Sequence, residues 1–285
     1  MIDAFAQQPL VYSFGQGRAE GSSAMKDILG GKGAGLAEMT NLGIPVPPGF
    51  TISATLCQTY LDTNSFPPRL RAQVEQALQR LEAATGREFG DASNPLLVSV
   101  RSGAAVSMPG MMETILNLGL NDHTVEGLAA KSNNPAFAWD CYRRFVQMYG
   151  VVVFDQPRAP FDHLVEEARH AHGAARDIDL PVAAIKALVA RFKAMITEQA
   201  GRAFPEEPME QLWGAIAAVF ESWNTRRAID YRRMHEIPDT MGTAVNIVAM
   251  VYGNLGETSG TGVTFSRNPS TGERLLYGEF LCNAQ

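Results

Sequence analysis

The sequence has few of the residues that build disulfide scaffolds, metal centres and nucleic-acid surfaces. Only three of its 285 residues are cysteines, Cys57, Cys141 and Cys282; they are far apart and odd in number, as is typical of reduced thiols in a cytoplasm. The five histidines show no spacing that suits a zinc site or a catalytic triad. Acidic residues outnumber Lys and Arg by 30 to 24, without a long basic run, so we expect no nucleic-acid surface.

Long hydrophobic runs are also absent. No apolar segment approaches the roughly 20 residues that a membrane span needs. The amino-terminal residues MIDAFAQQPL lack the basic and apolar regions of a signal peptide. We therefore expect a cytoplasmic protein that does not bind membranes. With 46% hydrophobic residues, the chain can still bury the core of one large domain or two smaller ones.

The most informative stretch is residues 97–120, LVSVRSGAAVSMPGMMETILNLGL. It opens with a short β-branched run that predicts a buried strand, which we expect to end at Arg101. A cation at the end of a rigid strand, followed by small residues that let a ligand approach the backbone, suits an anion. A buried arginine paired with a carboxylate fits the same spacing equally well, so both interpretations remain open.

A second candidate anion site lies in residues 30–35, GGKGAG. We expect this glycine-rich loop to open an amphipathic helix whose apolar face carries Leu36, Met39 and Leu42. Free N–H groups at a helix amino terminus attract anions, and Lys32 can reach a phosphate. The spacing is not that of a Walker A loop, and the pattern alone also fits a solvated lysine in a flexible turn.

Helical periodicity dominates the middle of the chain. Residues 70–84 predict an amphipathic helix that Gly86 ends. From about residue 121 to 204 apolar residues recur every three or four positions, which indicates a helical insertion. Residues 208–235 predict one long helix with a broad apolar face.

The last segment predicts strands again. Residues 243–252 read as a buried strand, residues 254–262 as a flexible loop, and residues 263–266 and 274–281 as two further strands. A loop of Gly, Thr and Ser between strands suits a mobile flap that closes over phosphates. A plain hairpin whose glycines serve the turn is the alternative, and the bare pattern favours it.

Three stretches resemble the amino-terminal, nucleotide-binding region of the pyruvate phosphate dikinase family. They begin at residues 30, 98 and 242 and read GGKGAGLAEMTNLGIPVPPGF, VSVRSGAAVSMPGMMETILNLGLND and GTAVNIVAMVYGNLGETSGTGVTFSRNPSTGE. The resemblance covers nearly the whole chain and is weakest between about residues 151 and 208. It implies an α+β, ATP-grasp-like nucleotide-binding domain with a helical insertion and an incomplete second half.

The resemblance also implies how the chain is divided. Residues 1–120 together with 205–240 would form the first ATP-grasp subdomain, and residues 121–204 the helical insertion. Residues 241–285 would begin the second subdomain, which is truncated.

The same resemblance assigns site residues. Lys32 and Arg101 would be catalytic and would contact the phosphates of ATP, and Arg144 would face the nucleotide cleft unless it is a plain surface arginine. The remaining nucleotide-binding residues would come from the last segment: Thr258, Ser259, Gly260, Thr261, Gly262 and Glu279. Relatives commonly carry glutamine where this chain has Val248, so one polar contact to the nucleotide is expected to be missing.

The implied parent enzyme is a phosphotransferase that uses ATP and Mg²⁺. It converts ATP, phosphate and pyruvate into AMP, pyrophosphate and phosphoenolpyruvate through a phosphohistidine on another domain. The histidine motif, the pyruvate-binding barrel and most metal ligands are expected beyond residue 285, so the chain alone should be inactive and any homo-oligomer should form through those domains. A phosphoenolpyruvate synthase-type dikinase and a non-catalytic nucleotide- or partner-binding module are the alternatives.

Overall fold

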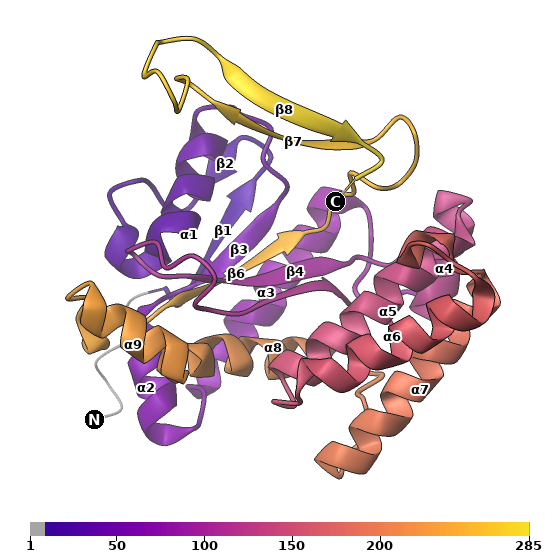
Figure 1. Ribbon diagram of the computed structural model, residues 1–285. Coiled ribbons are helices and arrows are strands. Elements are labelled where there is room, and N and C mark those ends of the chain that lie inside the picture. Colours follow the sequence, from indigo (N-terminus) through magenta and orange to yellow (C-terminus); the bar gives the residue numbers. More distant parts are fainter. Residues whose placement is uncertain (1–8, 285) are drawn as a thin grey trace.

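The computed structural model describes residues 9–284 and is built around a six-stranded antiparallel sheet in the order β2-β1-β3-β6-β4-β5 (Figure 1). Strand β6, from the carboxyl-terminal part of the chain, lies between β3 and β4, from the amino-terminal part. The sheet is therefore complete only when segments about 150 residues apart have paired. The strands are β1 Val11–Gly15, β2 Arg18–Ala19, β3 Gly49–Ile52, β4 Val98–Gly103, β5 Thr114–Leu118 and β6 Ala244–Ala249.

The two faces of this sheet carry different residues. Phe50, Val100 and Ile247 are opposite one another in register, are fully buried, and belong to the main core with α3 (Pro68–Thr85) and α8 (Pro208–Glu221). Their neighbours along the strands point to the other face, because side chains alternate in a strand. That other face is covered in part by α1 (Lys26–Asn41).

Helix α1 buries a different side from the one predicted. Met39 and Leu42 are 38% and 69% exposed, whereas Gly33, Ala34 and Ala37 lie against the sheet. A methyl group on Gly33 would come within 2.9 Å of the side chains beneath it. The helix packs so closely that only small residues fit, and the apolar stripe is left at the surface.

Helical structure fills most of the stretch between β5 and β6. Helices α4 (Thr124–Ser132), α5 (Pro135–Val152), α6 (Arg158–His172) and α7 (Val182–Ala200) gather beside β5 (Figure 1). Helix α2 (Thr55–Thr63) and α3 lie earlier in the chain, and the predicted end of α3 at Gly86 is confirmed. The helical periodicity of residues 121–204 is thus confirmed, while the division into subdomains remains a prediction.

The long helix predicted for residues 208–235 is broken. Helix α8 ends at Glu221, a 3₁₀ turn spans Ser222–Asn224, and α9 runs from Arg226 to Met234. The break lets the buried Arg232 guanidinium lie 4.3 Å from the Trp223 ring and bond to Asp239. The prediction was wrong because the packing of Arg232 on Trp223 and its bond to Asp239 have no signature in the helical periodicity.

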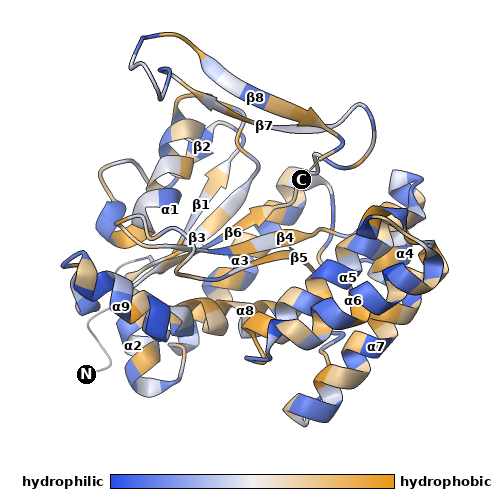
Figure 2. Cartoon of the chain, in the orientation of Figure 1, coloured by the Kyte–Doolittle hydropathy of each residue, from blue (hydrophilic) through white to orange (hydrophobic). Residues whose placement is uncertain are grey.

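The carboxyl-terminal segment forms a separate two-stranded antiparallel hairpin. Its strands, β7 (Gly260–Phe265) and β8 (Tyr277–Cys282), are exposed at every residue. Figure 1 shows the hairpin apart from the main sheet, and Figure 2 shows apolar residues along it. The predicted loop over residues 254–262 is too long, because pairing with β8 already begins at Gly260.

The overall result is a mixed helix and sheet architecture, so the predicted α+β class is confirmed. Within residues 9–284 no helix is both long and apolar enough to cross a membrane. The domain ranges predicted from the sequence include residues 1–8 and 285, which lie outside the described residues.

Candidate functional site

The glycine-rich turn of α1 touches the end of strand β4. Gly30 has φ 67° and ψ 174°, a conformation that is essentially restricted to glycine, and it kinks the helix. A Cβ atom at this position would lie 1.5 Å from the carbonyl oxygen of Gly103. One residue on, the Gly31 N–H donates to the Ala104 carbonyl over 2.9 Å. The turn before Lys32 is therefore fixed to β4 by backbone contacts.

This contact brings Lys32 and Arg101 together. The Lys32 ammonium donates to the carbonyl oxygen of Ser102, the residue after Arg101, over 2.9 Å. Partial burial and, secondly, the positive charge of Arg101 lower the pKa of Lys32. Two cations from segments about 70 residues apart thus converge on one end of the sheet.

Arg101 is exposed, and its strand continues to Gly103 rather than ending at the arginine. Within residues 9–284 neither Arg101 nor Lys32 forms an ion pair with a carboxylate. The interpretation of Arg101 as a buried arginine paired with an acid is therefore wrong. Two neighbouring cations without acidic partners are suited to hold a multiply charged anion.

Val248 lies on the same face of the sheet as Arg101. In the register of β4 and β6, Arg101 is opposite Asn246 and Ser99 is opposite Val248, so the two positions are one step apart along the same face. The position at which the resemblance expects glutamine therefore belongs to the surface that carries the cations.

Arg144 lies in a different but connected place. Its Nε is 2.8 Å from Asp140 Oδ2, and its side chain is 46% exposed. It lines a cavity of about 1000 Å³ between β5, α5 and α6, which four further arginines also line: Arg143, Arg158, Arg169 and Arg227. Thr114, the cross-strand partner of Arg101, is in the wall of this cavity, so the cavity reaches the strand pair that carries Arg101.

The predicted site residues of the hairpin are not brought to these cations. Thr258 and Ser259 precede β7, while Gly260, Thr261 and Gly262 are paired within it. Glu279 lies within β8, opposite Val263. Within residues 9–284 no hydrogen bond or ion pair joins any of them to Lys32 or Arg101. Their role stays a prediction.

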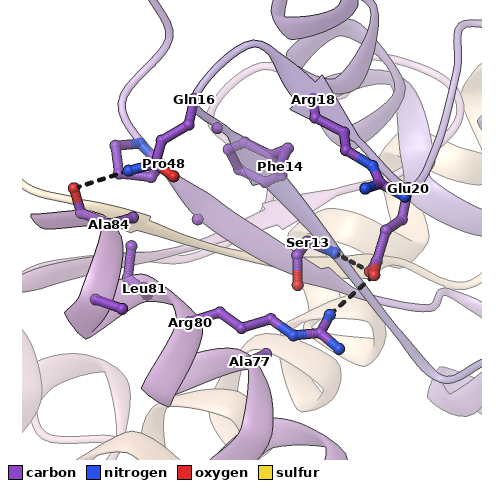
Figure 3. Close-up of a pocket in the computed structure, with 13 residues that line it drawn as sticks. Ser13, Phe14, Gln16, Arg18, Glu20, Pro48, Ala77, Arg80, Leu81 and Ala84 are labelled. Carbon is purple, nitrogen blue, oxygen red and sulfur yellow. Dashed lines mark hydrogen bonds and ion pairs between the residues drawn. The ribbon is translucent and has the colours of Figure 1, made fainter.

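Another hollow lies on the opposite side of the sheet, between α3 and the β1–β2 hairpin (Figure 3). It measures about 620 Å³. Glu20 accepts a hydrogen bond from Arg80 over 2.9 Å and from the Ser13 N–H over 2.7 Å, and the Gln16 amide donates to the Ala84 carbonyl. Sequence reasoning missed this hollow because its walls come from segments about 60 residues apart. Much of its polar surface is satisfied internally.

The chemistry around Lys32 and Arg101 does not suit a metal ion. Mg²⁺ prefers carboxylate and other oxygen ligands, whereas this end of the sheet presents cations. In the part of the chain that the structure describes, no cluster of three or more His, Cys, Asp or Glu residues could hold a metal. The arrangement is suited to phosphate or carboxylate groups.

An α+β fold with a glycine turn and two neighbouring cations that lack acidic partners is typical of a domain that binds anions. Residues 26–80 and 62–281 match the model of the pyruvate phosphate dikinase AMP/ATP-binding domain, and the chain belongs to this family. The resemblance noted in the sequence is thereby confirmed.

Curated relatives agree with this assignment. The chain is 55% identical over 276 residues to pyruvate, phosphate dikinase of Rhizobium meliloti (strain 1021) and 52% identical over 277 residues to that of Clostridium symbiosum. It is 53% identical over 276 residues to the chloroplastic pyruvate, phosphate dikinase 1 of Oryza sativa subsp. japonica. Each match covers 96% of this chain, but the chain spans only 29–31% of the length of these relatives.

Proposed function

We propose that this chain binds ATP through Lys32 and Arg101 as the nucleotide-binding part of a pyruvate phosphate dikinase. The observation that carries the proposal is the convergence of these two cations, without acidic partners, in a chain of this family. Charge-assisted hydrogen bonds from both side chains would hold the phosphates and stabilise negative charge during phosphoryl transfer. Lys32 would leave the Ser102 carbonyl to do so.

The other predicted residues would complete this site. Arg144 would contribute from the neighbouring cavity, where Asp140 orients it. Thr258, Ser259 and the backbone N–H groups of residues 260–262 would cover the phosphates when the hairpin closes as a flap, and Glu279 would approach the nucleotide from β8. We assign the fold to the ATP-grasp-like class on the same grounds, with residues 121–204 as the helical insertion and residues 241–285 as the start of the second subdomain.

Magnesium and the rest of the reaction would come from outside the described residues. Because the cationic end of the sheet does not fit a Mg²⁺ ion, the metal would be held by ATP phosphates and by carboxylates elsewhere in a longer protein. A histidine on another domain would accept a phosphoryl group from ATP and pass it to pyruvate bound on a further domain, in a cytoplasmic protein. The isolated chain would therefore bind nucleotide without completing the reaction.

The direct test is calorimetric titration of the 285-residue chain with Mg-ATP. We expect Lys32→Ala and Arg101→Ala each to weaken binding roughly 10- to 100-fold, the effect of losing a charge-assisted hydrogen bond. Arg18→Ala is the matched control, because Arg18 is an exposed strand arginine on β2 without an ion pair in the described chain. Equal affinities for the wild type and the two site variants would refute the assignment.

A further inference from the structure

Asn246 is a buried polar side chain that lacks part of its hydrogen bonding. It lies in β6 and is 1% exposed. Its Oδ1 accepts a hydrogen bond from the Thr51 hydroxyl over 2.9 Å, but its Nδ2 has no partner. An unsatisfied buried donor costs about 1–3 kcal/mol, and an apolar pair of the same shape would avoid this cost. The fold alone does not explain an asparagine at this position.

The Asn246 carboxamide lies close to the two elements that carry the cations, α1 and β4. A Cβ atom on Gly33 would be 2.9 Å from Asn246 Oδ1, and a Cβ atom on Gly103 would be 2.4 Å from Asn246 Nδ2. The carboxamide thus fills the space that these two glycines leave between α1 and β4. The same virtual Cβ atom of Gly103 is 3.6 Å from the Cβ of Lys32.

Asn246 is also the direct cross-strand partner of Arg101. One side chain therefore contacts the helix turn that carries Lys32 and is paired with the strand residue that carries the second cation. Aspartate has the same shape as asparagine, but its charge would pair with the cations and repel an anion. The amide is the isostere that separates the two elements without neutralising either cation.

We propose that Asn246 is a positioning residue that sets the distance between the Lys32 turn and the Arg101 strand, so that both cations reach the same phosphates. This inference rests on the proposed function of the Lys32–Arg101 pair as an ATP site. The inference adds that the buried, neutral amide of Asn246 sets the distance between the two cations, although its orphan N–H group destabilises the fold.

The test compares two variants that keep the branched shape of the Asn246 side chain and change its polarity or charge. The double variant Thr51→Val/Asn246→Leu removes the orphan N–H group, the Oδ1 acceptor and the Thr51 hydroxyl that donates to it. No buried polar group is then left without a partner, so we expect the variant to stay folded. We also expect a roughly tenfold weaker affinity for Mg-ATP, because the Lys32 turn is no longer held at its distance. Asn246→Asp should weaken Mg-ATP binding by a similar factor, through pairing with the cations.

A second readout separates positioning from a purely structural role. The Lys32 pKa, followed by NMR of lysine side chains labelled with ¹³C, should move in both variants relative to the wild type, and upward in Asn246→Asp. Gln156→Met is the matched control, since Gln156 is also a buried amide with an orphan atom, in the helical region next to α6. It should change neither the affinity nor the Lys32 pKa.

Unchanged affinity and unchanged Lys32 pKa in both Asn246 variants would overturn the proposal. If the double variant does not fold, the outcome of Asn246→Asp decides. If the wild-type chain itself does not bind Mg-ATP, the proposed function fails, whereas the Lys32 pKa in the variants still decides whether Asn246 positions the lysine.

Discussion

The main sheet and the β7–β8 hairpin are both antiparallel and both contain apolar residues, yet only one of them is packed. In the sheet, Ile247 is fully buried between β3 and β4; in the hairpin, Leu281 is 67% exposed. A two-stranded hairpin is marginally stable at best without a surface to pack on. The comparison teaches that this chain builds the cationic part of the candidate site by itself, while the predicted flap has little packing of its own.

The largest expected effect concerns Gly30, in the kinked turn of α1 that packs against β4. Gly30→Ala should destabilise the chain by about 4 kcal/mol or more, because alanine cannot adopt the Gly30 backbone and its Cβ would overlap the Gly103 carbonyl. Equilibrium unfolding in urea, followed by circular dichroism, measures this cost.

Gly35→Ala provides the matched control in the same helix. Nothing lies within 4 Å of a Cβ atom at Gly35, so alanine should be neutral or stabilise the helix by about 0.5–1 kcal/mol. Equal costs at Gly30 and Gly35 would mean that the turn does not contact β4 as described.

The next effect tests the difference between sheet and hairpin directly. Ile247→Ala should cost about 2–5 kcal/mol, because it leaves a cavity in a close-packed core. Leu281→Ala should change the free energy of unfolding by less than about 0.5 kcal/mol, since the side chain has little packing to lose. Urea unfolding of both variants under one condition gives the comparison, and a large cost at Leu281 would show that the hairpin packs on the rest of the chain.

The same contrast explains what the sequence could predict. The strand around Val100 and helix α3 were predictable because local periodicity and burial agree there. The exposed stripe of α1 was predicted wrongly, since Gly33 and Ala37 pack more closely than an apolar stripe would allow. The break after Glu221 also escaped prediction, because it depends on how the buried Arg232 packs on Trp223 and bonds to Asp239, which helical periodicity does not encode.

The candidate site was predictable to a similar degree. Lys32 and Arg101 were identified from residue type and resemblance, and the structure brings them together. The exposure of Arg101 was not predictable, because it depends on α1 covering only part of one face. Asn246 gave no signal either: in the sequence it is one polar residue in an apolar strand, and its place between two glycines exists only after β6 has paired with β4.

The smallest expected effect concerns the charge of Lys32. Its pKa in the folded chain is below the ordinary value of 10.5, so the unfolded chain binds more protons between these two values. The charged Lys32 therefore lowers the free energy of unfolding by its full amount at any pH below the folded-state pKa. This destabilisation disappears as the pH rises from the folded-state pKa to 10.5.

Lys32→Met removes this dependence and leaves the rest of the chain unchanged in charge. The difference in unfolding free energy between Lys32→Met and the wild type should shift in favour of the wild type as the pH rises from 7 to 10.5. We expect a shift below about 1 kcal/mol, because solvent screens a partly exposed charge. The slope of the difference is the informative quantity, since the lost hydrogen bond to the Ser102 carbonyl adds an offset that is nearly independent of pH below the folded-state pKa. A difference that stays constant over this range would mean that the Lys32 ammonium is affected neither by burial nor by Arg101, and the two cations would then not form one site.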